Sequence, residues 1–231
     1  MAFYGDLFRP RGHRGVGEAE LGASDVTDGL ERELLLRWWT AAAGQDSRVA
    51  GPAAAARLRT PLLVQRALDA LSHSAFFAGL GERAMIGSAR QVRRYFTEPA
   101  IRAAARERLA RAVTADTELI IAHSLGTVVA YETLCAHPQW RRPALITLGS
   151  PLAVPRLILD RLSPPPGAAP VPVRSWTNIA DSADVVALAK RLDPVFGGGI
   201  DDIAIHNGAH AHDVRPYLTA RETGQAVARA L

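Results

Sequence analysis

The sequence predicts an α/β protein with a mostly parallel sheet and helices on both faces of that sheet. From residue 118 onward, short apolar runs of strand length alternate with helical segments, as in parallel strands joined by crossover helices. A long, mostly helical stretch at residues 28–113 precedes this part of the chain. The 231 residues, 48% hydrophobic and 22% charged, fit a single domain, 1–231, with a sizeable core.

The N-terminal part predicts a short strand, a loop and a first helix. Residues 2–6 have the composition of a strand that ends in a turn, and residues 9–29 lack periodicity. Asp28 and Glu31 have the spacing of a capping box, which predicts a helix start at that point. The apolar face of the expected helix follows at Leu34, Leu35, Trp38 and Ala42.

Further helices are predicted up to residue 113. Gly51-Pro52 interrupts the first helical pattern, and Thr60-Pro61 opens the next helix with proline at the first helical position. A glycine-containing hinge at residues 76–81 precedes a third helix, and Pro99 opens a fourth. Residues 28–113 are therefore expected to form a helical cover or lid-like region within the domain.

The second half of the chain predicts the sheet. Strands are expected at residues 118–122, 144–148, 173–179 and 200–205. Helices are expected at residues 127–136, 185–192 and 219–231, with a proline-rich linker at 163–172 and a His-rich loop at 206–213. The alternation of these strands and helices is what predicts a parallel sheet.

The link between the first of these strands and its helix carries a chemical motif. Ala122-His123-Ser124-Leu125-Gly126 has the form small-x-Ser-x-Gly, which predicts a nucleophile elbow, a tight strand-to-helix turn. Small residues at both ends avoid collisions with the neighbouring strand and helix. Such a turn exposes the Ser124 hydroxyl and directs the Leu125 backbone N–H toward a developing oxyanion. His123 is expected to point away and to be structural.

A serine hydroxyl needs a base that accepts its proton, and the base needs an acid that orients it. In this type of fold the chain order is Ser, then Asp or Glu, then His. Asp184 lies just past the third strand and is the favoured acid, with Asp181 as its competitor. His212 ends the His-rich loop and is the favoured base, with His210 second.

Other classes of function have little support in the sequence. The histidines of residues 206–213 lack a carboxylate or cysteine cluster at metal-ligand spacing, so neither a metal nor another cofactor is expected. The net charge of +4 comes almost entirely from arginines interleaved with acids, without a nucleic-acid-binding motif. Cys135 is the single cysteine and cannot form an internal disulfide. No apolar run is long enough to span a bilayer, and no signal peptide is evident, so a cytoplasmic location is expected.

Several segments together resemble the α/β-hydrolase superfamily over roughly residues 115–231. They are Ala122-His123-Ser124-Leu125-Gly126, Thr147-Leu148-Gly149-Ser150-Pro151-Leu152, Trp176-Thr177-Asn178 with Asp184-Val185, and His212 with Tyr217-Leu218. Within this superfamily the segments are similar to lipase-like members, including class 3 lipases and acyl hydrolases of the post-GPI-attachment type. It also resembles a group of actinobacterial α/β hydrolases, some of which are named serine peptidases.

The resemblance implies a serine hydrolase that cleaves an ester or related acyl bond of a small molecule through an acyl-Ser124 intermediate. A serine peptidase, a thioesterase and a non-catalytic binding protein of the same fold stay open as alternatives, and the oligomeric state is left open. Such hydrolases usually begin with a strand and a His-Gly-type loop that supplies a second oxyanion donor. Here Gly12-His13-Arg14-Gly15 comes after the first strand-like segment. A shortened N-terminus, weak activity and a tendency to associate are therefore expected.

Overall fold

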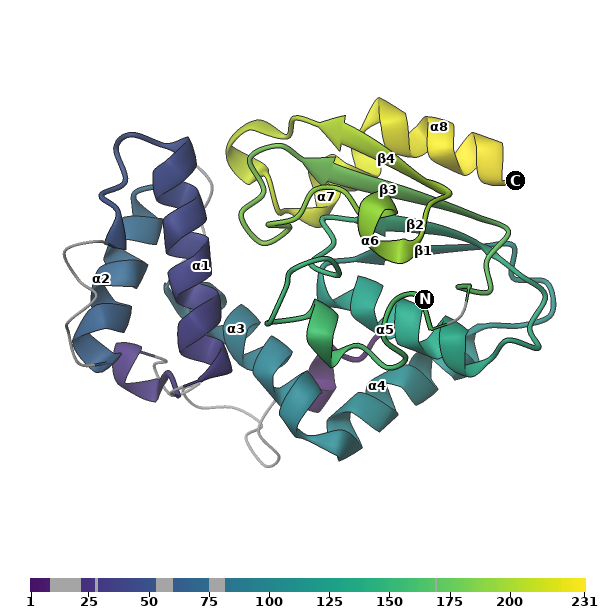
Figure 1. Ribbon diagram of the computed structural model, residues 1–231, viewed down its shortest axis with the longest axis horizontal. Coiled ribbons are helices and arrows are strands. Elements are labelled where there is room, and N and C mark those ends of the chain that lie inside the picture. The colour runs from purple at the N-terminus through teal and green to yellow at the C-terminus, as the bar shows by residue number, and fades with distance from the viewer. Residues whose placement is uncertain (9–21, 28, 53–59, 75–81, 169) are drawn as a thin grey trace. The chain divides into compact units, whose positions relative to one another are not determined.

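The computed structural model describes residues 1–8, 22–27, 29–52, 60–74, 82–168 and 170–231 (Figure 1). The chain divides into two compact units. One consists of Met1–Phe3 and Ala103–Leu231, and we call it the sheet unit. The other is Tyr4–Arg102, which we call the helical unit.

The sheet unit contains a four-stranded sheet in which all strands are parallel. The strands are β1 (Leu119–His123), β2 (Ala144–Leu148), β3 (Ser175–Asp181) and β4 (Ile200–Ile205), and they lie side by side in chain order. All of β2 is buried, as expected for an apolar run with a strand on either side. The structure confirms the α/β class with a parallel sheet.

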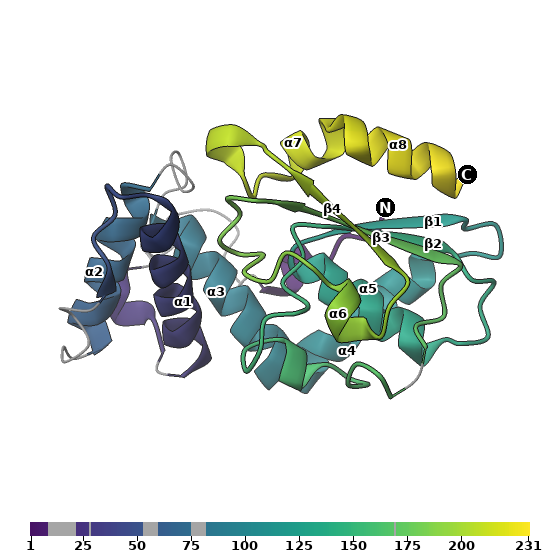
Figure 2. The same cartoon turned by 45° about the horizontal axis from the view of Figure 1, so that its top comes forward.

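Helices cover both faces of this sheet. α5 (Leu125–Ala136) and the short α6 (Asp193–Phe196) lie on one face, and α8 (Arg221–Ala230) lies on the other (Figure 2). Because each new strand is added on the same side of the last, crossovers of one handedness place their connections on one face. α8 contacts β2 and β3 on the opposite face. Because all four strands are parallel, their carboxyl ends meet at one edge of the sheet.

Several predicted boundaries in the sheet unit are wrong. The helix expected at residues 127–136 begins at Leu125, directly after the serine, and the third strand is shifted to Ser175–Asp181. The closing helix expected at 219–231 is present as α8, and α7 (Val214–Thr219) is an additional helix that was not predicted.

The helix expected at residues 185–192 is absent from the structure. Its backbone groups bond to side chains instead of to one another. The N–H groups of Val186 and Ala187 donate to Asp184 Oδ1 at 2.8 and 3.1 Å. The Lys190 carbonyl accepts from Asn178 Nδ2 at 2.9 Å. Side chains outside the segment thus satisfy backbone groups that a helix would have paired internally.

The helical unit is built from α1 (Leu30–Gln45), α2 (Thr60–Ser72) and α3 (Glu82–Thr97). α4 (Pro99–Ala112) follows α3 and runs on into the sheet unit. These helices confirm the predicted helical character of residues 28–113. Their buried side chains form a core of their own, including Leu35, Trp38, Leu63, Leu68, Met85 and Ile86. The expected strand at residues 2–6 is wrong: Gly5–Phe8 is a 3-10 helix, closed by the Leu7 N–H donating to the Tyr4 carbonyl.

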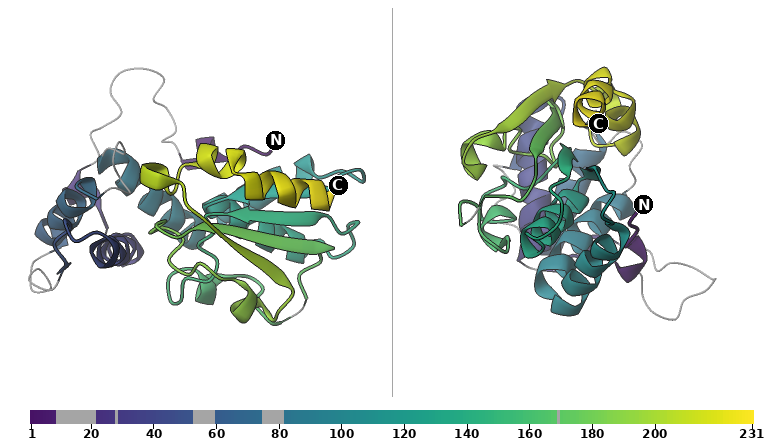
Figure 3. Two further views of the ribbon diagram at one scale, coloured as in Figure 1. Left: turned by 90° about the horizontal axis from the view of Figure 1, so that it is seen from above. Right: turned by 90° about the vertical axis from the view of Figure 1, so that its right-hand side faces the viewer.

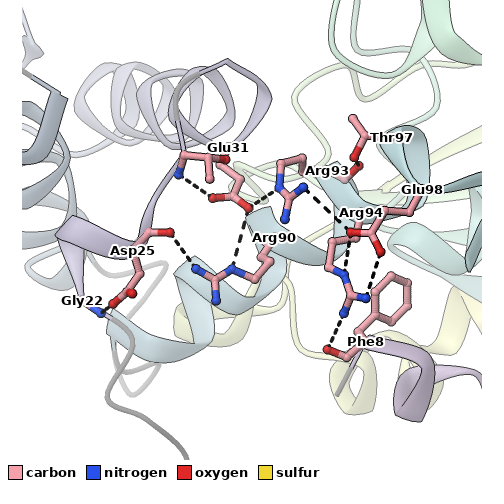
Figure 4. A network of polar contacts seen from close by, with 10 residues as sticks. Phe8, Gly22, Asp25, Glu31, Arg90, Arg93, Arg94, Thr97 and Glu98 are labelled. Atoms are coloured by element: carbon pink, nitrogen blue, oxygen red, sulfur yellow. Dashed lines mark hydrogen bonds and ion pairs between the residues drawn. The ribbon is translucent and has the colours of Figure 1, made fainter. Parts of the chain in front are cut away.

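A buried glutamate fastens α1 to α3 (Figure 4). Glu31 is 0% exposed and accepts from Arg93 Nε at 2.6 Å, and Arg90 Nε lies at 3.8 Å. Its other carboxylate oxygen accepts from the Thr27 N–H at 2.8 Å. Asp28 lies outside the described residues, but α1 has its N-cap at Gly29, so the expected capping box of Asp28 and Glu31 is wrong. The Glu31 side chain instead pairs with two arginines of another helix.

Candidate active site

The turn between β1 and α5 has the backbone of a nucleophile elbow. Ser124 has φ 52° and ψ −129°, a left-handed conformation that costs a non-glycine residue free energy. The turn is held on both sides: the Ser124 N–H donates to the Leu148 carbonyl at 3.1 Å, and the Ser124 carbonyl accepts from Thr127 N–H and Oγ1. The strain is thus offset locally, and the hydroxyl lies at the carboxyl edge of the sheet.

His212 connects this hydroxyl to a buried carboxylate. His212 Nε2 lies 2.9 Å from Ser124 Oγ, and His212 Nδ1 lies 2.7 Å from Asp184 Oδ2. The three residues come from the β1–α5 turn, the loop after β3 and the loop after β4. The structure therefore brings together the three residues that the sequence analysis favoured.

Asp184 is held as an anion although it is 0% exposed. Burial favours its neutral form, but the charge and hydrogen bond of His212, the nearby Lys190 and the Ala187 N–H outweigh burial and lower the Asp184 pKa. Lys190 Nζ also donates to the Asp184 backbone carbonyl. An ionised Asp184 with a donor at Nδ1 directs the lone pair of His212 Nε2 toward Ser124.

The structure gives the two competing residues other places. Asp181 Oδ1 accepts from the Ala183 N–H at 2.6 Å, and Asp181 Oδ2 accepts from the Asn207 N–H. Asp181 thus ties the end of β3 to the loop that carries His212. His210 is exposed in the 3-10 helix Gly208–His210. His212 is the residue that lies next to Ser124, and Asp184 is the residue that lies next to His212.

Gly149 leaves room for the Asp184 carboxylate. It has φ 53°, and a Cβ at this position would lie 2.8 Å from Asp184 Oδ2 and 3.2 Å from the Tyr217 hydroxyl. Gly149 entered the sequence analysis only as part of a resembling segment. Glycine is needed here because two residues far away in the chain, Asp184 and Tyr217, approach this position. The sequence carries no local signal of that approach.

Two aromatic side chains that the sequence analysis did not assign to the site pack against it. The Tyr217 hydroxyl donates to Asp184 Oδ2 at 2.9 Å. The His123 ring lies 4.7 Å from the His212 ring and 5.8 Å from the Tyr217 ring, centroid to centroid. Burial, with the charge of His212, lowers the pKa of His123 to about 4, so His123 is neutral near pH 7. His123 therefore packs against His212 instead of pointing away from the site.

One oxyanion donor of the expected pair lies in a suitable place. Leu125 is the first residue of α5, where N–H groups have no partner within the helix and the helix dipole is positive. The segment Gly12-His13-Arg14-Gly15 lies outside the described residues.

Other features bear on the chemistry. Within the part of the chain that the structure describes, no group of three or more His, Cys, Asp or Glu side chains could hold a metal ion. No described helix combines the length and the apolar character needed to cross a membrane. Trp38 and Trp39 are 1% and 3% exposed within the core of the helical unit. The hinge expected at residues 76–81 also lies outside the described residues.

The site is thus a hydrogen-bonded series of Ser124, His212 and Asp184 at the carboxyl edge of a parallel sheet, with a helix N-terminus beside the serine. Comparisons of the chain with family models, with curated proteins and with solved structures found no match.

Proposed function

We propose that the chain is a serine hydrolase that cleaves an ester or related acyl bond through an acyl-Ser124 intermediate. The observation that carries this proposal is the pair of hydrogen bonds from His212, at 2.9 Å to Ser124 Oγ and at 2.7 Å to Asp184 Oδ2. Each heavy-atom distance lies within the range for proton transfer between a nucleophile, a base and an orienting acid.

In the proposed reaction, Ser124 Oγ attacks the acyl carbon while its proton passes to His212 Nε2. Asp184 stabilises the imidazolium that forms, and the Leu125 N–H donates to the oxyanion of the tetrahedral intermediate. His212 then gives the proton to the leaving alcohol as the bond to the acyl carbon breaks. Water, deprotonated by the same imidazole, attacks the acyl-serine, which releases the acid and restores Ser124.

Labelling with a fluorophosphonate tests the nucleophile. Ser124 Oγ should bond to the phosphorus with loss of fluoride, because its proton has an acceptor in His212. Ser124→Ala should abolish labelling. Ser150→Ala is a matched control, since Ser150 follows the neighbouring strand and its Oγ pairs with Thr127 Oγ1 at 2.9 Å. Labelling that survives Ser124→Ala overturns the proposal.

Substitutions of the favoured and competing residues test the acid and the base. Asp184→Asn and His212→Ala should each slow ester hydrolysis by roughly 10³-fold or more, as is usual when one member of such a series is removed. Asp181→Asn and His210→Ala should cost much less. Rates on a simple ester, its thioester and a peptide amide would decide between the esterase and its thioesterase and peptidase alternatives. The reverse order of effects would assign the roles to Asp181 or His210.

A further inference from the structure

Tyr217 is a buried tyrosine whose hydroxyl lies between the end of β3 and the acid of the proposed site. It belongs to α7 and is 0% exposed. Its hydroxyl donates to Asp184 Oδ2 at 2.9 Å and accepts from the Asp181 N–H at 2.8 Å. We propose that Tyr217 is a positioning residue that fixes the Asp184 carboxylate and weakens its pull on His212. For its effect on turnover, this inference rests on the proposed function.

The Asp184 carboxylate receives a full set of donors. Oδ1 accepts from the N–H groups of Val186 and Ala187. Oδ2 accepts from His212 Nδ1 and from the Tyr217 hydroxyl. An ionised carboxylate has about four acceptor sites, so these donors leave it no rotation without the loss of a hydrogen bond. The tyrosine and the histidine share one oxygen, which couples them.

The Tyr217 hydroxyl is always present as a donor. Burial and, after it, the negative charge of Asp184 raise the Tyr217 pKa far above its ordinary value. The side chain packs in a core cluster with Ile146, Leu148, Ile179 and Ala226. The Tyr217 carbonyl also accepts from Thr223 Oγ1 at 2.6 Å, which ties α7 to α8. A rigid core therefore holds the hydroxyl against Oδ2.

The electrostatic potential at His212 is set by the charged groups around it. The titratable and charged groups around the site come from several elements. They are His123 in β1, Asp181 at the end of β3, Asp184 after β3, Lys190 before β4, Asp213 before α7 and Tyr217 in α7. Asp184 bonds to Nδ1 directly, and Tyr217 bonds to the same carboxylate oxygen. Without the tyrosine hydroxyl, Oδ2 would carry more charge toward Nδ1 and stabilise the imidazolium further.

Tyr217→Phe tests this inference against Tyr131→Phe. Tyr131 is a matched control: it is 1% exposed, and its hydroxyl donates to the Pro164 carbonyl at 3.0 Å. The imidazole titration of His212 is followed by NMR in histidine-labelled protein and assigned with His212→Gln. In Tyr217→Phe the His212 midpoint should rise by about 0.5–1 pH unit. In Tyr131→Phe it should equal that of the wild type.

The same substitution should change the pH–rate profile. Because the base is neutral only above its midpoint, the acid limb of kcat/KM should move to higher pH by the same amount. Below the limb, kcat/KM should fall about three- to tenfold, the factor that such a displacement gives. If Tyr217 had a purely structural role, Tyr217→Phe and Tyr131→Phe would both lower the midpoint of thermal unfolding. The acid limb of kcat/KM would then stay at the same pH in both variants.

A fluorinated tyrosine tests the inference without loss of either hydrogen bond. 3-Fluorotyrosine, incorporated at position 217 alone by suppression of a stop codon, donates a stronger hydrogen bond to Oδ2 and should lower the His212 midpoint. This arm stays decisive if Tyr217→Phe fails to fold. An unchanged midpoint with the fluorinated residue, or with a folded Tyr217→Phe, overturns the inference. Absence of fluorophosphonate labelling would overturn the proposed function alone, because the NMR titration needs no turnover.

Discussion

At the scale of single residues, His123 keeps a second positive charge away from the site. Its ring lies 4.7 Å from that of His212, which becomes an imidazolium in the proposed reaction. Burial is the main reason that the His123 pKa is lowered to about 4. Two adjacent imidazolium rings would repel each other, so a neutral His123 favours protonation of His212 alone.

The lowered pKa of His123 predicts a pH dependence of stability. The pKa is about 4 in the folded protein and 6.5 for an ordinary histidine, so as pH falls the unfolded chain binds a proton first. Stability is therefore fully present above pH 6.5 and is lost as pH falls toward 4, by on the order of 3 kcal/mol. His123→Gln should remove this loss, and urea unfolding at several pH values measures it. His206→Gln, at an exposed histidine, should keep the wild-type slope, and equal slopes in both variants would contradict the prediction.

The sequence predicted some residues of the site better than others. Ser124 and Leu125 could be placed because an elbow is a local pattern, and Asp184 and His212 because chain order limits the choice. The structure brings these residues together, and their catalytic roles stay predictions. Tyr217 could not be found in this way, since its hydrogen bond to Asp184 depends on how α7 packs against the sheet. His123 was placed on the wrong side of the elbow for the same reason.

At the scale of elements, the turn after β2 is shaped by the loop after β3. Gly149 begins this turn with φ 53°, and its N–H donates to the Ile179 carbonyl at 3.0 Å. Asp184 Oδ2 occupies the space that a Cβ of residue 149 would need. The turn and the carboxylate therefore fit only with glycine at this position.

Gly149→Ala is expected to displace Asp184. The added methyl group meets Oδ2 at 2.8 Å in a backbone conformation that already disfavours alanine. Labelling of Ser124 should slow by about tenfold or more, the usual cost of a misplaced catalytic group. Gly197→Ala separates the two causes: its φ is 89°, and nothing lies within 4 Å of its Cβ position, so it should lose about 1 kcal/mol of stability and keep the rate. Equal labelling rates in both variants would contradict the prediction.

The segment that precedes β4 shows where periodicity misleads. Residues 185–192 have a helical pattern, yet Asn178 and Asp184 take up their backbone groups. Both side chains come from outside the segment, and Asn178 is 1% exposed between its neighbouring strands. A local pattern cannot show that buried polar side chains from elsewhere will compete for the same backbone groups. By contrast, β2 and β4 were predicted correctly as Ala144–Leu148 and Ile200–Ile205. For β2 the reason is local, because a short apolar run is typical of a strand buried in a parallel sheet.

At the scale of the whole molecule, each compact unit has its own core. The alternation of strands and helices predicted the α/β class, but the division into a sheet unit and a helical unit was not predicted. It follows from long-range packing, of which the Glu31 pairs with Arg90 and Arg93 are an example.

Glu31→Gln should weaken the helical unit selectively. The substitution leaves Arg93, 26% exposed, without its buried anion, and the loss should be about 3 kcal/mol. Limited proteolysis with mass spectrometry should then show faster cleavage within α1–α3. Glu33→Gln, on the same helix, is the control, because Glu33 is 45% exposed and lies 4.0 Å from Arg37. Ser124 labelling should be unchanged in both. Equal cleavage of the two variants would contradict the prediction.

Among the described residues, β1 pairs on one side only, with β2 (Figure 3). Ile121 in this strand is 41% exposed. The Glu118 carbonyl and the Ser124 N–H both bond to residues at the ends of β2. Because backbone groups alternate along a strand, the amides of Leu119, Ile121 and His123 face away from β2. These amides should exchange with solvent deuterium through small local openings, while those of Ile120 and Ala122 need separation from β2. Within the described ranges, the strand that leads into Ser124 is thus restrained by a neighbouring strand on one side only, and its pairing with β2 holds the Ser124 N–H.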